Sequence, residues 1–262
     1  WKQLSDIDWF TNFVKAWIAF NAWYRNHYPN IKTDRKILEE IKRSSNIKSK
    51  FNSLLNGSGE KHSYFREQLG FLHYKLQNKE IKHKGIRLSF EEYVNIDKSS
   101  KGETLTYRNI EYEIVRNSIN TEENYVKFDK VKVKNRNGYI LNLTDLKINY
   151  ESIYKYKDKI REFIIQDNKF RKLSLAQKEK IINIMTNELN PFKIINFLQV
   201  SNGNFYKFGN FKFIKEQDLI FSALIDILYS LRNVLFHGEI IPDRETNEVY
   251  EPAYKILKML ID

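Results

Sequence analysis

The sequence predicts a mainly α-helical bundle with a small antiparallel β-sheet inserted in its middle. Apolar residues recur at helical spacing in long segments toward both ends of the chain. Between residues 86 and 144, β-branched and aromatic residues alternate with polar ones, as in half-buried strands. Only 9 Gly and 4 Pro occur among 262 residues, so regular structure should dominate. We therefore predict a helical core from residues 1–85 and 145–262, and a β-rich insertion at residues 86–144.

Three helices are expected before the insertion. Residues 5–28 carry a broad stripe of Trp, Phe and Tyr at helical spacing, which is typical of a helix packed on a core. Pro29 ends this helix. A second helix is expected at residues 32–55, and a third at residues 60–76. Asn56, Gly57, Ser58 and Gly59 separate these two, because such residues favour loops.

The insertion contains two clear alternating runs, at residues 106–115 and 125–133. Asn137 and Gly138 then form a dipeptide that favours a two-residue hairpin turn. These features predict neighbouring antiparallel strands.

Helical spacing returns after the insertion. The segment at residues 216–237 is apolar on most faces, which predicts a helix at the centre of a bundle or at a dimer interface. Gly238 suits its C-terminal cap. A loop or short hairpin is expected at residues 202–213. The other expected helices are residues 149–168, 174–189, 191–200 and 250–261.

The chain is strongly basic, with 44 Lys+Arg against 33 Asp+Glu and a formal net charge of +11. Such a surplus favours polyanionic partners, chiefly nucleic acid, although a solvated cationic surface has the same composition. The strand segment interleaves lysine with aromatic residues, as a nucleic-acid surface or an ordinary strand with one wet face would. The candidate RNA-binding residues are Lys130, Lys132, Lys134, Arg136, Lys169, Arg171 and Lys172.

Several classes of site are excluded or not expected. No cysteine is present, which excludes disulfides and thiolate chemistry and fits a reducing cytoplasm. The histidines lack acidic or histidine partners at metal-ligand spacing, and no phosphate-binding glycine loop occurs. We therefore expect no metal and no cofactor. We also expect no membrane association, because no apolar run looks long enough to span a bilayer.

The segment with the most chemistry lies at the end of the apolar helix, where Arg232 and Asn233 are followed by His237. An imidazole can move protons near neutral pH, and a guanidinium can hold a phosphate through paired N–H donors. Asn233 and His237 are four residues apart and share a helix face. Alternatively, such residues only cap the helix end. Arg66 and His73 satisfy a looser form of the pattern, and we interpret them as part of a salt-bridged surface helix.

The Arg232-Asn233-x3-His237 pattern resembles the Arg-x4–6-His signature of HEPN ribonucleases, in which a polar residue, commonly Asn, often follows the arginine. Residues 16–24 also resemble the first helix of larger HEPN proteins from bacterial phage-defence and toxin loci. The resemblance implies an HEPN-like helical bundle that dimerises and brings two Arg/His pairs into one site. Toxins of this kind that are paired with nucleotidyltransferase antitoxins carry a tyrosine where this chain has Glu239, so that route of regulation is not expected.

The resemblance further implies cleavage of RNA without a metal, by attack of the ribose 2′-hydroxyl on the adjacent phosphate. His237 would be the general acid or base, Arg232 would stabilise the pentavalent phosphate, and Asn233 would orient one of them. The leading hypothesis is thus a cytoplasmic, homodimeric endoribonuclease in antiviral defence or a toxin–antitoxin system, controlled by a protein or RNA regulator. The alternatives are a non-catalytic module that holds a small structured RNA, and a protein-interaction domain with an incidental basic surface.

Overall fold

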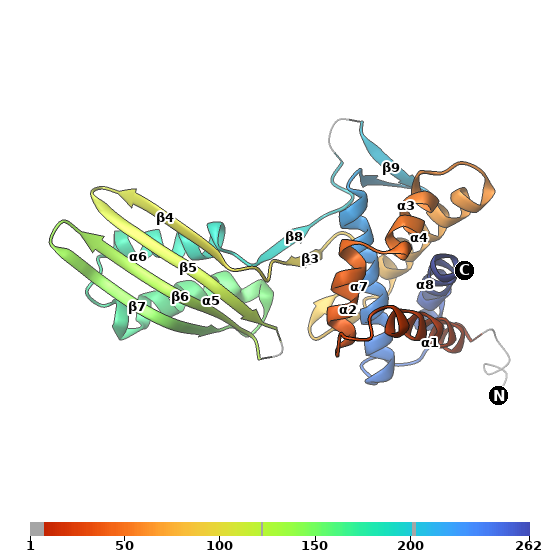
Figure 1. Ribbon diagram of the computed structural model, residues 1–262, viewed down its shortest axis with the longest axis horizontal. Coiled ribbons are helices and arrows are strands. Elements are labelled where there is room, and N and C mark those ends of the chain that lie inside the picture. Colours follow the sequence, from red (N-terminus) through yellow and green to blue (C-terminus); the bar gives the residue numbers. More distant parts are fainter. Residues whose placement is uncertain (1–7, 122, 201–202) are drawn as a thin grey trace. The chain divides into compact units, whose positions relative to one another are not determined.

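The computed structural model describes residues 8–121, 123–200 and 203–262 (Figure 1). The chain forms two compact units. Unit 1 combines Trp1–Tyr93 with Ile194–Asp262, and unit 2 is Val94–Lys193. Each unit has its own hydrophobic core.

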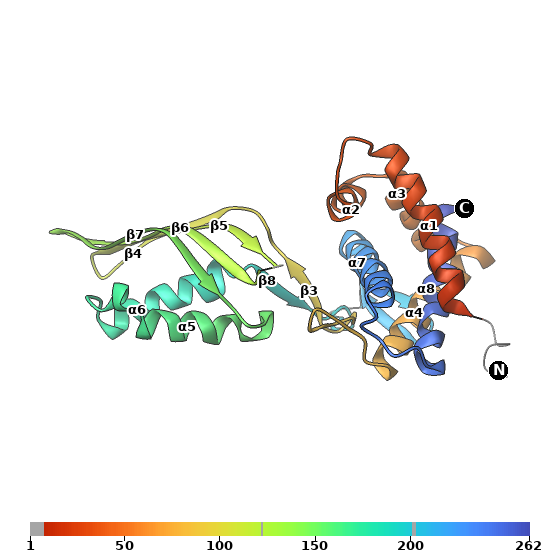
Figure 2. The ribbon, with the colours of Figure 1, turned by 90° about the horizontal axis from the view of Figure 1, so that it is seen from below.

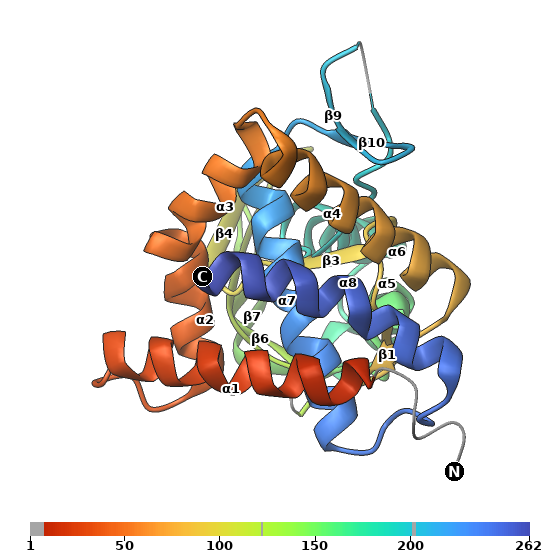
Figure 3. The ribbon, with the colours of Figure 1, turned by 90° about the vertical axis from the view of Figure 1, so that its right-hand side faces the viewer.

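Unit 1 is built mainly from helices. They are α1 (Trp9–His27), α2 (Asp34–Arg43), α3 (Asn46–Asn56), α4 (Glu60–Asn78), α7 (Gln217–Phe236) and α8 (Arg244–Ile261). The aromatic stripe of α1 is buried, as predicted, and Phe13 meets Tyr250 of α8 edge-on at 5.2 Å between ring centroids. Helix α8 lies between α1 and α4 (Figure 3). It is tied to α7 by the Tyr250 hydroxyl, which donates to the Leu231 carbonyl at 2.8 Å.

Unit 1 also holds two hairpins. Strands β1 (Lys82–His83) and β2 (Ile86–Arg87) pair across Lys84 and Gly85, which both have positive φ. Strands β9 (Phe205–Phe208) and β10 (Phe211–Ile214) form the hairpin predicted near residues 202–213. Helix α4 approaches β9 closely at Gly70, where a Cβ atom would lie 2.4 Å from the Phe208 carbonyl oxygen.

Unit 2 is a four-stranded antiparallel sheet with helices on one face (Figure 2). Its strands are β4 (Lys101–Tyr107), β5 (Ile110–Asn120), β6 (Tyr125–Asn135) and β7 (Gly138–Asn149), in that spatial order. Helices α5 (Tyr156–Gln166) and α6 (Leu175–Asn183) cover the face that carries Val131 and Val133. A π-helical turn, Ile184–Glu188, follows α6. Arg136 and Asn137 form the turn that joins β6 to β7, one residue before the predicted position, and Gly138 pairs with Asn135 as the first residue of β7.

Two short strands carry the chain between the units. Strand β3 (Tyr93–Ile96) leads from unit 1 into unit 2, and β8 (Phe192–Ile195) leads back. The two strands pair with each other. The helix predicted at residues 191–200 is therefore wrong. Asn190 precedes Pro191, which disfavours helical backbone at that point, and the following Phe-Lys-Ile-Ile run has high strand propensity.

The predicted fold class is wrong as well. The structure is 51% helix and 24% strand, a mixed α/β protein rather than a mainly helical bundle with a small inserted sheet. The physical reason is where two helices bury their apolar faces. Ile160 and Ile164 of α5, with Ile181 of α6, pack on the sheet and not on the helices of unit 1. The unit built on the four-stranded sheet thus spans residues 94–193, whereas the predicted insertion spans residues 86–144.

By length and composition, helix α7 could cross a membrane, although we expected no apolar segment long enough to span a bilayer. However, 56% of its most apolar window is buried within the structure. A helix that forms the centre of a protein core has the same composition, and burial inside unit 1 accounts for the apolar character of α7.

Candidate functional site

The end of α7 presents His237 because Gly238 stops the helix there. Gly238 has a φ of 64°, in the left-handed region that glycine adopts without strain. Its N–H donates to the Leu235 carbonyl at 3.4 Å, and the Glu239 N–H donates to the Val234 carbonyl at 2.9 Å. This is the Schellman pattern of helix termination, and it confirms the predicted cap. The His237 side chain is left exposed at the helix end.

Arg232 lies one turn before His237 and is held on two sides. Its Nη1 donates to Asn233 Oδ1 at 2.9 Å, and its guanidinium carbon lies 4.6 Å from the centroid of the Phe236 ring. Phe236 is 53% exposed, so this stacked pair lies at the surface. The guanidinium is thereby fixed in direction near the helix end.

Arg232 also lies near α1. Burial, followed by the Asp34 carboxylate, raises the pKa of the Tyr24 hydroxyl, while the positive charges of Arg25 and Arg232 partly oppose that rise. Asp34 begins α2 and forms an ion pair with Arg25. The Arg232 guanidinium therefore lies within electrostatic range of a buried phenol on α1.

Asn233 links the two other motif residues. Its side chain is buried and accepts the hydrogen bond from Arg232, while its backbone carbonyl accepts the His237 N–H at 2.9 Å. Within the ranges that the structure describes, the Arg232 and His237 side chains make no direct contact. The motif thus places a guanidinium and an imidazole at one helix end, and the Asn233 side chain holds the guanidinium.

A second imidazole lies beside this helix end and was missed by the sequence analysis. His83 Nδ1 lies 2.9 Å from Glu239 Oε2. Burial raises the pKa of Glu239, but hydrogen bonds from His83 and the Lys84 backbone, together with the nearby His237, hold that pKa below its usual value. The Glu239 carboxylate therefore contacts one histidine and lies within electrostatic range of a second. His83 and Glu239 are separated by 156 positions in the chain, so no local pattern could have joined them.

The candidate RNA-binding residues fall into two environments in unit 2. Lys130 and Lys132 both lie against Glu113, at 3.0 and 3.8 Å, on the sheet face opposite the helices. The ordinary solvent-exposed face of a strand explains the positions of Lys130 and Lys132. Lys134 and Arg136 lie farther along β6 and in the turn after it. Lys169, Arg171 and Lys172 are exposed in the connection between α5 and α6, around the buried Phe170.

The second Arg/His pair is not the surface helix that we expected. Arg66 donates to the carbonyls of Leu55 and Gly57, at 3.0 and 2.9 Å, and so caps the end of α3. His73 is 1% exposed, with its ring 4.4 Å from that of Phe211. Burial lowers the pKa of His73 to about 4. His73 therefore lies in the core, and the partly buried Arg66 has a structural role at the end of α3.

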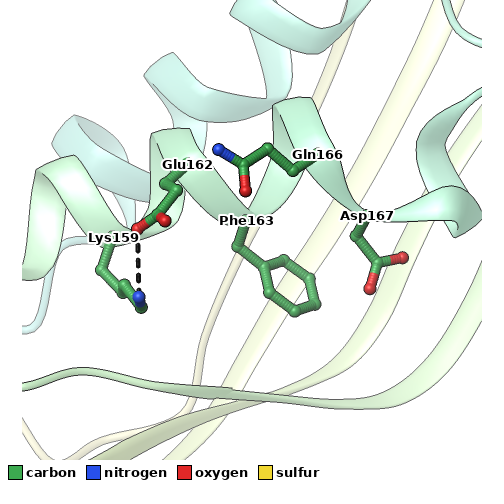
Figure 4. Close-up of a pocket in the computed structure, with 5 residues that line it drawn as sticks. All are labelled: Lys159, Glu162, Phe163, Gln166 and Asp167. Carbon is green, nitrogen blue, oxygen red and sulfur yellow. Dashed lines mark hydrogen bonds and ion pairs between the residues drawn. The ribbon is translucent and has the colours of Figure 1, made fainter.

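Unit 2 has a hollow at α5 (Figure 4). It is lined by Lys159, Glu162, Phe163, Gln166 and Asp167. Lys159 and Glu162 pair with each other at 3.0 Å, so their charges are mutually satisfied. Among the described residues, no group of three or more His, Cys, Asp or Glu side chains could hold a metal ion.

Comparisons of the chain with protein-family models, curated proteins and solved structures found no match.

Proposed function

We propose that the chain is a metal-independent endoribonuclease that acts at the end of α7. The observation that carries the proposal is the exposed His237 imidazole one helical turn from the oriented Arg232 guanidinium. These two groups supply what RNA cleavage through the 2′-hydroxyl requires, namely proton transfer and stabilisation of a phosphorane. The resemblance of this motif to that of HEPN ribonucleases supports the same chemistry.

In the proposed reaction, the 2′-oxygen forms a bond to phosphorus and the bond from phosphorus to the 5′-oxygen breaks. One imidazole accepts the proton of the 2′-hydroxyl, and a second, protonated imidazole donates a proton to the leaving 5′-oxygen. Arg232 neutralises the charge that builds up on the phosphorane oxygens. The products are a cyclic phosphate and a 5′-hydroxyl. We propose that His237 of a second copy of the chain supplies the other imidazole in a homodimer.

The test uses the purified full chain and labelled RNA in EDTA. Wild-type protein is expected to release fragments with cyclic phosphate ends, and His237→Ala and Arg232→Ala are each expected to slow cleavage by about a hundredfold or more. His27→Ala and Arg43→Ala are matched controls. His27 is another exposed histidine near a helix end, and Arg43 is exposed and pairs with Glu40. The proposal fails if wild type does not cut, or if His237→Ala cuts as fast as the controls.

A non-catalytic RNA-binding module is the second candidate. It is favoured by the hydrogen bond between Arg232 and Asn233, which also suits a guanidinium that only grips phosphate, and by the net charge of +11. Retained binding of RNA without cleavage by wild type would establish this candidate instead.

We further propose that the enzyme acts in the cytoplasm, in antiviral defence or a toxin–antitoxin system. The absence of cysteine from all 262 residues supports a reducing compartment. A free endoribonuclease would damage its own host, so a protein or RNA regulator is part of this proposal.

A further inference from the structure

One end of the unit 2 sheet carries both of its tight hairpin turns. Tyr107 pairs with Ile110 across the β4–β5 turn, and Lys134 pairs with Glu111 on one side and Tyr139 on the other. The register therefore sets the β4–β5 and β6–β7 turns side by side. The connection between α5 and α6 lies toward the same end in both views of the unit (Figures 1 and 2). We call the β4–β5 turn, the β6–β7 turn and the α5–α6 connection the turn end, which comprises residues 107–110, 134–139 and 167–174.

The cations of the turn end differ from those elsewhere on the sheet. On the outward face of the sheet, farther from the turns than Lys134, Lys127 pairs with Asp145 at 2.7 Å, and Lys147 with Glu123 at 3.5 Å. Six cations at the turn end form no ion pair with an acidic residue of the described ranges, although Glu111 lies across from Lys134 in the register. They are Arg108, Lys134, Arg136, Lys169, Arg171 and Lys172. These six cations of the turn end are thus not neutralised by an ion pair within the described residues.

Two tyrosine rings are exposed among these cations, one on each face of the sheet. Tyr139 lies opposite Lys134 on the outward face, whereas Tyr107 pairs with Ile110 on the face that the helices cover. Lys180 Nζ of α6 also lies 5.3 Å from the Tyr107 ring centroid. Tyr107 is 44% exposed, and the Arg108 guanidinium lies 5.1 Å from its ring centroid. Tyr139 is 56% exposed, with Lys134 Nζ 5.7 Å from its ring centroid. Exposed aromatic rings beside free cations provide stacking platforms for bases and binding groups for phosphates.

The backbone conformation of the β4–β5 turn also fixes the position of an exposed cation. Arg108 and Asn109 both have positive φ, 50° and 59°, as a two-residue hairpin of type I′ requires. Glycine or asparagine is favoured in such a conformation, and a bulky side chain there carries strain. In this strained position, the arginine is held beside the exposed Tyr107 ring.

We propose that the turn end binds single-stranded nucleic acid, with Tyr107 and Tyr139 stacking on bases and the surrounding cations holding phosphates. Unpaired strands fit this surface because the faces of paired bases are covered by their neighbours in a duplex. This surface is separate from the end of α7, and the proposal does not depend on cleavage. Lys130 and Lys132, already engaged by Glu113, are not required.

The test measures binding of the full chain to fluorescent oligo(dT) and oligo(U), by anisotropy over a range of salt concentrations. Oligo(dT) has no 2′-hydroxyl, so its binding is measured independently of the proposed cleavage. Arg108→Ala with Arg136→Ala is expected to weaken binding at least tenfold. The same change is expected to reduce the slope of log K against log salt by about 1.4, since two phosphate contacts are lost. Tyr107→Leu with Tyr139→Leu is expected to weaken binding by about tenfold or more with an unchanged slope.

The matched control is Lys127→Ala with Lys147→Ala. It also removes two positive charges from unit 2, but from lysines that form ion pairs on the outward face of the sheet. It is expected to change binding by less than about threefold. Thermal unfolding of each variant verifies that unit 2 remains folded. The proposal is overturned if both charge variants weaken binding equally, if a duplex of the same length binds as well as the single strand, or if no binding occurs at low salt. A wild-type protein that binds oligo(dT) as expected but does not cleave RNA would contradict the proposed nuclease function at α7 and would still support this proposal.

Discussion

Two helices of unit 1 carry the same loose pattern of arginine followed by histidine, and the structure uses them in opposite ways. In α4, His73 lies in the middle of the helix against Phe211 and Phe213, with its ring fully enclosed. In α7, His237 is the first residue after the helix and is exposed. The comparison teaches that the position of a histidine relative to the helix end, rather than its distance from an arginine, decides whether its imidazole reaches solvent.

The two arginines also differ in what their guanidinium groups contact. Arg66 donates hydrogen bonds to carbonyls at the end of α3. Arg232 bonds to its neighbour Asn233 and stacks on an exposed ring. The pair in α4 therefore serves stability, whereas the pair in α7 is available for chemistry.

The largest expected effect is on catalysis. His237→Gln should reduce the initial rate of RNA cleavage by about 10²–10⁴-fold, because it removes a proton-transfer group. His73→Leu should leave the rate within about twofold of wild type, since a buried, unpartnered imidazole is replaced by an apolar side chain of similar size. The contrast between α4 and α7 breaks down if His73→Leu, while folded, loses as much activity as His237→Gln.

The next effect is on stability against pH. The pKa of His73 is lowered from 6.5 to about 4 in the folded protein. The unfolded chain therefore takes up a proton first as pH falls below 6.5, and stability declines until the pH approaches 4. This histidine should account for a loss of about 3 kcal/mol across that window. Urea unfolding at several pH values should show a shallower decline for His73→Leu than for wild type, and an equal decline would contradict this assignment.

A smaller effect is expected at the residue that ends α7. Gly238→Ala should lower the free energy of unfolding by about 1 kcal/mol, because alanine is strained at a φ of 64°. No atom lies within 4 Å of the added Cβ position, so backbone strain alone is tested. Gly238→Asn should recover most of the loss, since asparagine tolerates this conformation better. Equal losses in denaturant unfolding for both variants would argue against the termination mechanism.

The smallest effect concerns the second imidazole beside α7. His83→Asn removes the contact with Glu239 and should cost less than about 1 kcal/mol of stability, since this is a partly exposed pair. If His83 only neighbours the site, the cleavage rate should fall by less than about tenfold, well short of the loss for His237→Gln. A loss as large as that for His237→Gln would assign the second proton transfer to His83 of the same copy.

Local patterns in the sequence correctly predicted α1, the β9–β10 hairpin, a turn near Asn137 and the helix cap at Gly238. Each depends on residues within a few positions of one another. The assignment of α5 and α6 was wrong because the apolar face of a helix does not reveal its packing partner. The pairing of Lys130 with Glu113 depends on strand register, and that of His83 with Glu239 on the tertiary fold.

The paired strands β3 and β8 have a consequence for how such a protein can change over time. On the unit 1 side, Phe197 N–H donates to the Phe90 carbonyl at 2.9 Å; on the unit 2 side, Asp97 N–H donates to the Pro191 carbonyl at 2.9 Å. A module whose two ends are adjacent can be exchanged within a host domain without breaking the host core. The junction at β3 and β8 therefore allows unit 2 to be replaced by a different module while the core of unit 1 is kept.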